Sequence, residues 1–181
     1  MAKEFERIVE APILNDPFYI ECIRLAEFSR SEQQRYGSLL TKDRVILGRG
    51  YNRATNHPSF TQKLERIIYQ GYANHAEIEG LNDALMRGHD VQNAEIYVGS
   101  YFPKENGLLF LHNEYTCLKC PPILISYAIS IINVPTPQGW LPKTTNEALV
   151  EARAYSIGEI YENRIQSVQG GWKITDLATR L

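Results

Sequence analysis

The spacing of hydrophobic and polar positions predicts the order of helices and strands along the chain. Apolar residues recur at helical spacing, or helix-start residues stand together, in five segments: 16–29, 61–69, 74–88, 121–127 and 145–163. Runs that alternate in polarity or are rich in β-branched residues predict strands at 38–41, 44–51, 95–99 and 129–134. A tight turn at Lys42-Asp43 is expected to join the first two strands into a hairpin.

Strands that alternate with helices predict an α/β fold, in which a layered sheet carries helices on both faces. Because the chain opens with a hairpin, the sheet is expected to be mixed. We interpret residues 1–181 as one domain, with a core at about 16–155, an inserted loop at 101–115, and a C-terminal helix and tail at 156–181.

The composition is typical of a soluble globular protein with a sizeable core: of 181 residues, 44% are hydrophobic and 22% are charged. The formal net charge of −2 gives no electrostatic footprint for a long nucleic acid, which favours a small-molecule substrate. No apolar run predicts a membrane span, and the N-terminus lacks the apolar stretch of a signal peptide, so we expect a cytoplasmic location. Three cysteines, an odd number, argue against a disulfide framework.

One histidine and a Cys-x-x-Cys pair form a candidate metal site. Zinc favours imidazole and thiolate ligands, which His75, Cys117 and Cys120 would supply. Three protein ligands leave one position for water, as in catalytic rather than structural zinc sites. His75 and Glu77 fall in the first turn of one predicted helix, and both cysteines fall at the start of another, where the helix dipole favours thiolate. We therefore expect one Zn²⁺ per chain.

Each part of this pattern also has a simpler interpretation. A lone histidine such as His75 is more often a packed or surface residue, and Asn74-x-x-Glu77 matches a capping box in which Glu77 is structural. The Cys-x-x-Cys pair alone fits a redox pair or half of a zinc ribbon. However, no second Cys-x-x-Cys or His pair completes a ribbon, and a redox pair does not explain the histidine. The pieces in this order favour a catalytic zinc.

Two motifs, HAEIEGL from His75 and TCLKC from Thr116, resemble the zinc signature of the cytidine/deoxycytidylate deaminase superfamily. The segment GSLLTKDRVILGRGYN, from Gly37 to Asn52, is similar to the opening hairpin of the deoxycytidylate deaminase branch. This resemblance covers most of residues 16–134. It implies a three-layer α/β/α fold around a five-stranded mixed sheet.

The resemblance also implies a hydrolase that releases ammonia from a cytosine nucleotide or nucleoside, with a deoxycytidylate-like substrate favoured. Zinc lowers the pKa of bound water to about 7, and Glu77 would be the catalytic proton shuttle. Asn52 would contact the sugar or base, and Ala76 is a further candidate for substrate contact. Arg53 is a candidate partner for a phosphate, although a solvated loop arginine is the more common role. Members of the family often assemble, so a homo-oligomer is expected.

The sequence departs from the family at two places. Thr116 stands where the family usually has proline, and the stretch 101–115 is long relative to compact members. We interpret that stretch as a lid or a subunit contact near the pocket, with a surface excursion as the alternative.

Other functions share the same motifs. A tRNA adenosine, or free guanine or cytosine, is an alternative substrate for the same zinc chemistry. The alternative from another class is a non-catalytic, zinc-stabilised interaction module. Such a module would need a fourth ligand, for which His112 and Cys22 are the candidates.

Overall fold

The computed structural model describes residues 6–7, 11–31, 34–53, 75–102, 107–111, 117–162 and 171–175, with side chains described in 11–31, 34–53, 75–100 and 117–154. Four of the features singled out above lie outside these residues: the helix predicted at 61–69, Asn74, His112 and Thr116. Within the described part of the chain, no helix combines the length and apolar character needed to cross a membrane.

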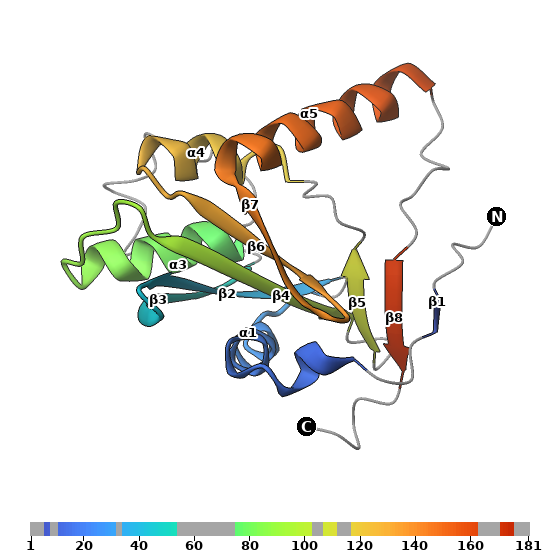
Figure 1. Ribbon diagram of the computed structural model, residues 1–181, viewed down its shortest axis with the longest axis horizontal. Coiled ribbons are helices and arrows are strands. Elements are labelled where there is room, and N and C mark those ends of the chain that lie inside the picture. Colours follow the sequence, from blue (N-terminus) through green and yellow to red (C-terminus); the bar gives the residue numbers. More distant parts are fainter. Residues whose placement is uncertain are drawn as a thin grey trace.

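A mixed β-sheet forms the centre of the molecule (Figure 1). Five strands make its core in the order β3-β2-β4-β6-β7: Val45–Tyr51, Arg35–Lys42, Glu95–Phe102, Ile131–Thr136 and Gly139–Thr144. β4 and β6 are parallel, whereas β2 runs antiparallel to both β3 and β4, and β6 runs antiparallel to β7. The α/β class and the five-stranded mixed sheet expected from the sequence are confirmed.

Three short strands extend the sheet beyond these five. β5 (Gly107–Leu111) pairs antiparallel with the end of β4, β8 (Gly171–Thr175) pairs antiparallel with β5, and β1 (Glu6–Arg7) pairs parallel with β8. The stretch 101–115, expected to be an inserted loop, therefore contributes the end of β4 and all of β5 to the sheet. Its action as a lid or a subunit contact stays a prediction.

Helices cover both faces of the sheet. In Figure 1, α1 lies below the strands, after the short 3₁₀ helix η1, while α4 and α5 lie above them. The elements run over Pro12–Asn15 (η1), Pro17–Glu27 (α1), Ala76–Met86 (α3), Cys120–Ser126 (α4) and Thr145–Glu162 (α5). The helices predicted around 16–29, 74–88, 121–127 and 145–163 are thus confirmed to within a few residues.

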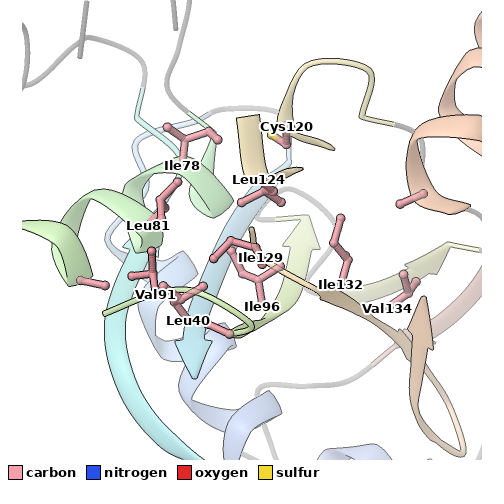
Figure 2. Close-up of a cluster of buried hydrophobic side chains, with 13 residues drawn as sticks. Leu40, Ile78, Leu81, Val91, Ile96, Cys120, Leu124, Ile129, Ile132 and Val134 are labelled. Carbon is pink, nitrogen blue, oxygen red and sulfur yellow. The ribbon is translucent and has the colours of Figure 1, made fainter. Parts of the chain in front are cut away.

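One cluster of buried hydrophobic side chains joins the sheet to α3, α4 and α5 (Figure 2). Its strand residues include Leu40 and Ile96, and its helix residues include Leu81 and Leu124. Because successive side chains of a strand point to opposite faces, the residues next to them in sequence face α1 instead. The ring of Tyr97, for example, packs edge-on against Phe18 of α1, with ring centroids 4.9 Å apart. The three-layer arrangement follows directly from this alternation.

Asp16 begins α1, as its place before Pro17 predicts. Its Oδ1 accepts hydrogen bonds from the backbone N–H groups of Phe18 at 2.9 Å and Tyr19 at 3.0 Å, which satisfies two donors of the first turn. The same oxygen accepts a third bond, at 3.0 Å, from the indole N–H of Trp140 on β7. The start of the first helix is thereby tied to the far end of the central sheet.

Two local details differ from the prediction. β7 was not expected, because its sequence GWLPKT does not alternate in polarity and Pro142 has no N–H for a strand ladder. Among the described strands β7 pairs with β6 alone, and an edge strand of this kind tolerates proline. The hairpin turn also lies one residue later than expected, because Asp43 and Arg44 adopt positive φ angles of 51° and 63°. Positive φ at both central residues is typical of a type I′ turn.

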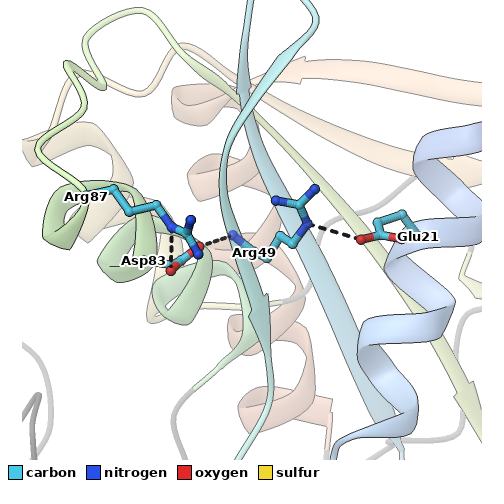
Figure 3. Close-up of polar contacts among 4 residues, drawn as sticks. All are labelled: Glu21, Arg49, Asp83 and Arg87. Carbon is cyan, nitrogen blue, oxygen red and sulfur yellow. Dashed lines mark hydrogen bonds and ion pairs between the residues drawn. The ribbon is translucent and has the colours of Figure 1, made fainter.

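A series of ion pairs and hydrogen bonds joins α1, β3 and α3 at one edge of the sheet (Figure 3). Arg49 Nε lies 3.1 Å from Glu21 Oε1, and Arg87 Nε lies 2.9 Å from Asp83 Oδ1. The backbone N–H of Arg49 donates to Asp83 Oδ2 at 2.9 Å. Because these side chains are largely exposed, the ion pairs add little stability. The clearer effect is that Asp83 occupies a backbone donor on the edge strand β3.

Glycines allow α3 to lie directly against β3. A Cβ atom at Gly50 would stand 2.2 Å from the backbone N of Gly80 and 2.3 Å from the carbonyl O of Ala76. Both neighbours are backbone atoms of α3, which cannot rotate out of the way. This contact fixes the N-terminal end of α3, where His75 and Glu77 stand.

We predict that Gly50→Ala lowers the free energy of unfolding by about 1–3 kcal/mol or more, because the added methyl group overpacks a backbone contact. Urea unfolding followed by circular dichroism measures the loss. Gly80→Ala is the matched control: its Cβ would meet the Ser38 hydroxyl at 2.7 Å, a side-chain atom that can rotate, so the loss should be smaller. If Gly50→Ala kept the wild-type free energy of unfolding, α3 and β3 would not be in direct backbone contact at Gly50.

Candidate metal centre

Three side chains converge where the N-terminal ends of α3 and α4 meet; we call them the His-Cys-Cys group. His75 is the N-cap residue of α3, Cys120 is the first residue of α4, and Cys117 lies in the turn before it. His75 Nδ1 lies 3.2 Å from Cys117 Sγ and 3.3 Å from Cys120 Sγ. All of the ligand atoms lie within 4.8 Å of one another, so this group can hold a metal ion.

The surroundings of Cys117 favour its thiolate. Hydrogen bonding to Cys120, and then to His75, lowers the pKa of Cys117 to about 4, although burial acts in the opposite direction. One of these bonds comes from the backbone N–H of Cys120, at 3.3 Å. The hydrogen bond to Cys117 in turn raises the pKa of His75. Since the thiolate is the form that binds metals, Cys117 is prepared to act as a ligand.

Glu77 is buried in the first turn of α3, with 5% of its surface exposed. Its charge also helps to raise the pKa of His75, which stands two positions earlier at the same end of α3. His75 is the N-cap residue of α3, so Glu77 is the second residue of the helix, whereas a capping box places its glutamate third. Asn74, the other half of that box, lies outside the described residues.

Cys22, one of the two candidates for a fourth ligand, lies away from the His-Cys-Cys group. It belongs to α1, on the opposite face of the sheet, and its thiol donates to the carbonyl O of Tyr97 at 3.7 Å. Burial raises the pKa of this thiol far above its usual range. Among the residues that the structure describes, three ligands make up the group.

Asn52 and Ala76, two candidates for substrate contact, both make hydrogen bonds that join neighbouring segments of the chain. The Asn52 side chain accepts from the N–H of Tyr36 at 2.8 Å and donates to the carbonyl O of Gln34 at 3.1 Å. Ala76 is fully buried, and its carbonyl accepts the Ser38 hydroxyl at 2.6 Å. These contacts fix the ends of β2 and β3 beside the start of α3. Contact of either residue with a substrate stays a prediction.

Arg53 makes an ion pair that the sequence pattern does not predict. Its Nε lies 3.2 Å from Oε2 of Glu79, whose side chain is 3% exposed, against 26% for the arginine. The guanidinium also stacks over the ring of Tyr51, at 4.6 Å from the ring centroid. Arg53 is thus held against α3 rather than solvated. The one sign of this ion pair in the sequence is the position of Glu79, which follows Glu77 by two residues in a buried helix.

Removing this cation is predicted to destabilise the protein. Arg53→Ala takes away one partner of a buried carboxylate, and we expect the free energy of unfolding to fall by about 1–3 kcal/mol. Arg49→Ala is the control, because its ion pair with Glu21 is exposed and should be worth about 1 kcal/mol or less. Urea unfolding of both variants compares the two pairs. Equal losses would argue against a special role for the Arg53–Glu79 pair.

Three further residues meet across β2 and β4 and were not singled out from the sequence: Gln34, Tyr36 and Ser100. Burial, followed by the charges of Glu77 and Cys117, raises the pKa of Tyr36. Gln34 Nε2 donates to Ser100 Oγ at 2.9 Å. The alternation of side chains along β2 indicates which of its residues share one face of the sheet. Only the register with β4 shows which residues lie beside them.

Comparisons with known proteins give structural similarity alone. No family model matches the chain, and no curated protein matches its sequence. A cytidine deaminase from Burkholderia pseudomallei is 16% identical, with a TM-score of 0.48, and the match covers 72% of this chain and 92% of that one. The dCMP deaminase from the cyanophage S-TIM5 is 13% identical, with a TM-score of 0.43, over 64% of this chain and 76% of that one. A diaminohydroxyphosphoribosylaminopyrimidine deaminase/5-amino-6-(5-phosphoribosylamino)uracil reductase from Thermotoga maritima is 18% identical, with a TM-score of 0.39, and the match covers 83% of this chain and 40% of that one.

Proposed function

We propose that this chain is a zinc-dependent hydrolytic deaminase that releases ammonia from a cytosine nucleotide or nucleoside, with deoxycytidylate as the leading substrate. The observation that carries the proposal is the convergence of His75, Cys117 and Cys120 beside the buried carboxylate of Glu77. Three ligands and one adjacent carboxylate are the parts that water activation requires.

The donor set fits zinc. With ordinary Zn–N and Zn–S bond lengths, a nitrogen and a sulfur ligand of a tetrahedral site lie about 3.6 Å apart. The observed separations of 3.2 Å and 3.3 Å need only a small outward movement of the side chains. A zinc ion bound there supplies a Lewis acid that lets water ionise near neutral pH.

Glu77 moves the protons in this proposal. Its carboxylate accepts a proton from the attacking water and delivers it to the ring nitrogen next to the amine-bearing carbon. A second proton from the same water then passes through Glu77 to the leaving amino group. The carbon–nitrogen bond breaks, ammonia leaves, and the water oxygen remains as the carbonyl oxygen of the uracil product.

Asn52, Arg53 and Ala76 remain our candidates for substrate contact. Gly50, two residues before Asn52, packs directly on the carbonyl of Ala76, so the end of β3 lies beside the start of α3. Asn52 is the candidate for the sugar or base, and Arg53 is the candidate for a phosphate. Assembly into a homo-oligomer and a cytoplasmic location stay predictions.

The experiment is a substrate panel on the zinc-loaded wild-type protein, scored by ammonia release. The panel holds cytidine, deoxycytidine, their monophosphates, cytosine, guanine and adenosine. We expect the highest rate on deoxycytidine monophosphate. Release from adenosine or guanine alone would change the substrate class, and a zinc-loaded protein that releases ammonia from none of them would favour the interaction module.

A further inference from the structure

The charges of Arg53 and Glu79 face each other one helical turn from the His-Cys-Cys group. The backbone N–H of Glu79 donates to the carbonyl O of His75 at 3.1 Å, so the first turn of α3 links this glutamate directly to a member of the group. Arg53, two residues beyond the end of β3, places its Nε 3.2 Å from Oε2 of Glu79. One ion pair thus joins the end of β3 to the helix that begins at the candidate metal centre.

The two partners of this ion pair differ in their access to a ligand. The side chain of Glu79 is almost fully buried, whereas that of Arg53 is 26% exposed. The guanidinium meets Glu79 through Nε, and its two terminal amino groups carry further N–H donors. It also lies over the ring of Tyr51, at 4.6 Å from the ring centroid. A phosphate can therefore touch the arginine from outside, while the carboxylate of Glu79 stays covered behind it.

Glu79 offsets the positive charge that a phosphate would meet. An arginine attracts a phosphate strongly by itself, because its guanidinium stays charged and offers paired N–H donors. Here Arg53 and Glu79 carry opposite charges, so the pair presents no net charge to a ligand. Within a few ångströms both charges act on a phosphate with similar strength. Hydrogen bonds from Arg53 to a phosphate remain possible, but most of the electrostatic attraction is cancelled.

We propose that Glu79 is a specificity-determining residue, which by neutralising Arg53 lets the site accept a nucleoside as well as its 5′-monophosphate. This inference rests on the proposed deaminase function, in which Arg53 is the candidate for a phosphate, and deepens it. Hydrogen bonds from Arg53 favour the monophosphate, but the phosphate is not required for turnover. We expect wild type to prefer deoxycytidine monophosphate over deoxycytidine by no more than about tenfold in kcat/KM.

The test is the ratio of kcat/KM for deoxycytidine monophosphate to that for deoxycytidine, measured by ammonia release from the zinc-loaded protein. Both substrates carry the same base and meet the same sample, so a loss of folded or zinc-loaded protein lowers both values and leaves the ratio unchanged. Glu79→Gln removes the negative charge and nearly keeps the side-chain shape. We expect this variant to raise the ratio by about tenfold, mainly through a lower KM for the monophosphate.

Arg53→Gln tests the other partner of the ion pair, and it also serves if Glu79→Gln does not fold. This variant removes the cation and leaves the negative charge of Glu79, which repels a phosphate, so the ratio should fall by about tenfold. The double variant carries neither charge. Its ratio should therefore lie above that of Arg53→Gln, which a purely structural role of the ion pair does not predict.

The matched control is Glu21→Gln, because Glu21 also pairs with an arginine of β3, Arg49, but at the exposed edge of the sheet (Figure 3). Its ratio should equal that of wild type. An unchanged ratio in folded Glu79→Gln or Arg53→Gln would overturn the proposal for Glu79, and so would a wild-type ratio far above about tenfold. In both cases ammonia release by wild type still upholds the proposed function. If wild type released no ammonia from any substrate, the proposed function would fall together with this inference.

Discussion

Replacing Glu77 by glutamine is expected to lower the rate of ammonia release by about 10²–10⁴-fold, the usual contribution of a general acid–base residue. Glutamine has nearly the same shape as glutamate, but its amide cannot take up and return a proton. Because Glu77 is buried in the first turn of α3, a substitution of equal size keeps the packing there. Zinc content and the unfolding midpoint should therefore stay at their wild-type values.

The measurement combines steady-state ammonia release, metal analysis and thermal unfolding of the same samples. Asp83→Asn is the matched control, because it neutralises a carboxylate of the same helix that faces Arg49 and Arg87 at the edge of the sheet. That variant should keep its turnover. Full activity in Glu77→Gln would remove Glu77 from the mechanism, whatever the metal content.

Removing the metal is expected to cost both activity and stability. His75 and Cys117 are 42 positions apart, so a bound ion joins α3 to the turn before α4 and adds its binding energy to folding. At a free zinc concentration about 1,000-fold above Kd, that energy is about 4 kcal/mol. A chelator should lower the free energy of unfolding of the wild-type protein by this order and abolish ammonia release.

Cys117→Ser provides the control for this prediction. The variant keeps a side chain of similar size but loses a thiolate ligand, so it should bind zinc poorly. Its free energy of unfolding before the chelator is added should therefore already be lower than that of the zinc-loaded wild type. Adding the chelator to it should change the unfolding curve little. A chelator effect as large in Cys117→Ser as in wild type would show that the stabilising metal is bound elsewhere.

The sequence predicted those features whose physical cause is local. Asp16 before Pro17 marks a helix start by its own chemistry, and α1 begins there. His75, Cys117 and Cys120 could be grouped because zinc favours imidazole and thiolate ligands and the three occur together in an order that the simpler interpretations do not explain, and the structure brings all three together. Glu77 was found because it stands two residues from one of them.

The features that were missed depend on strand register, which local sequence does not encode. Tyr36 stands opposite Ser100 because β2 pairs with β4 in this register, and it shares with Ser38 the face of β2 that meets α3. In the sequence Glu79 has no feature that marks it out from other helix residues. The structure shows its partner, because Arg53, after the end of β3, places its Nε 3.2 Å from Oε2 of Glu79. β7 gave no alternating pattern and contains Pro142, which is tolerated because β7 pairs with β6 alone among the described strands.

The three donors gathered on Oδ1 of Asp16 have a consequence for folding. The indole of Trp140 joins that oxygen from 124 positions away in the sequence, so the chain must close a very long loop before this contact forms. Contacts of such high sequence separation slow folding and are made when most of the chain is already in place. The first helix and the β6–β7 hairpin are thus expected to share one cooperative unit in native-state hydrogen exchange, opening together although they are made from opposite halves of the sequence.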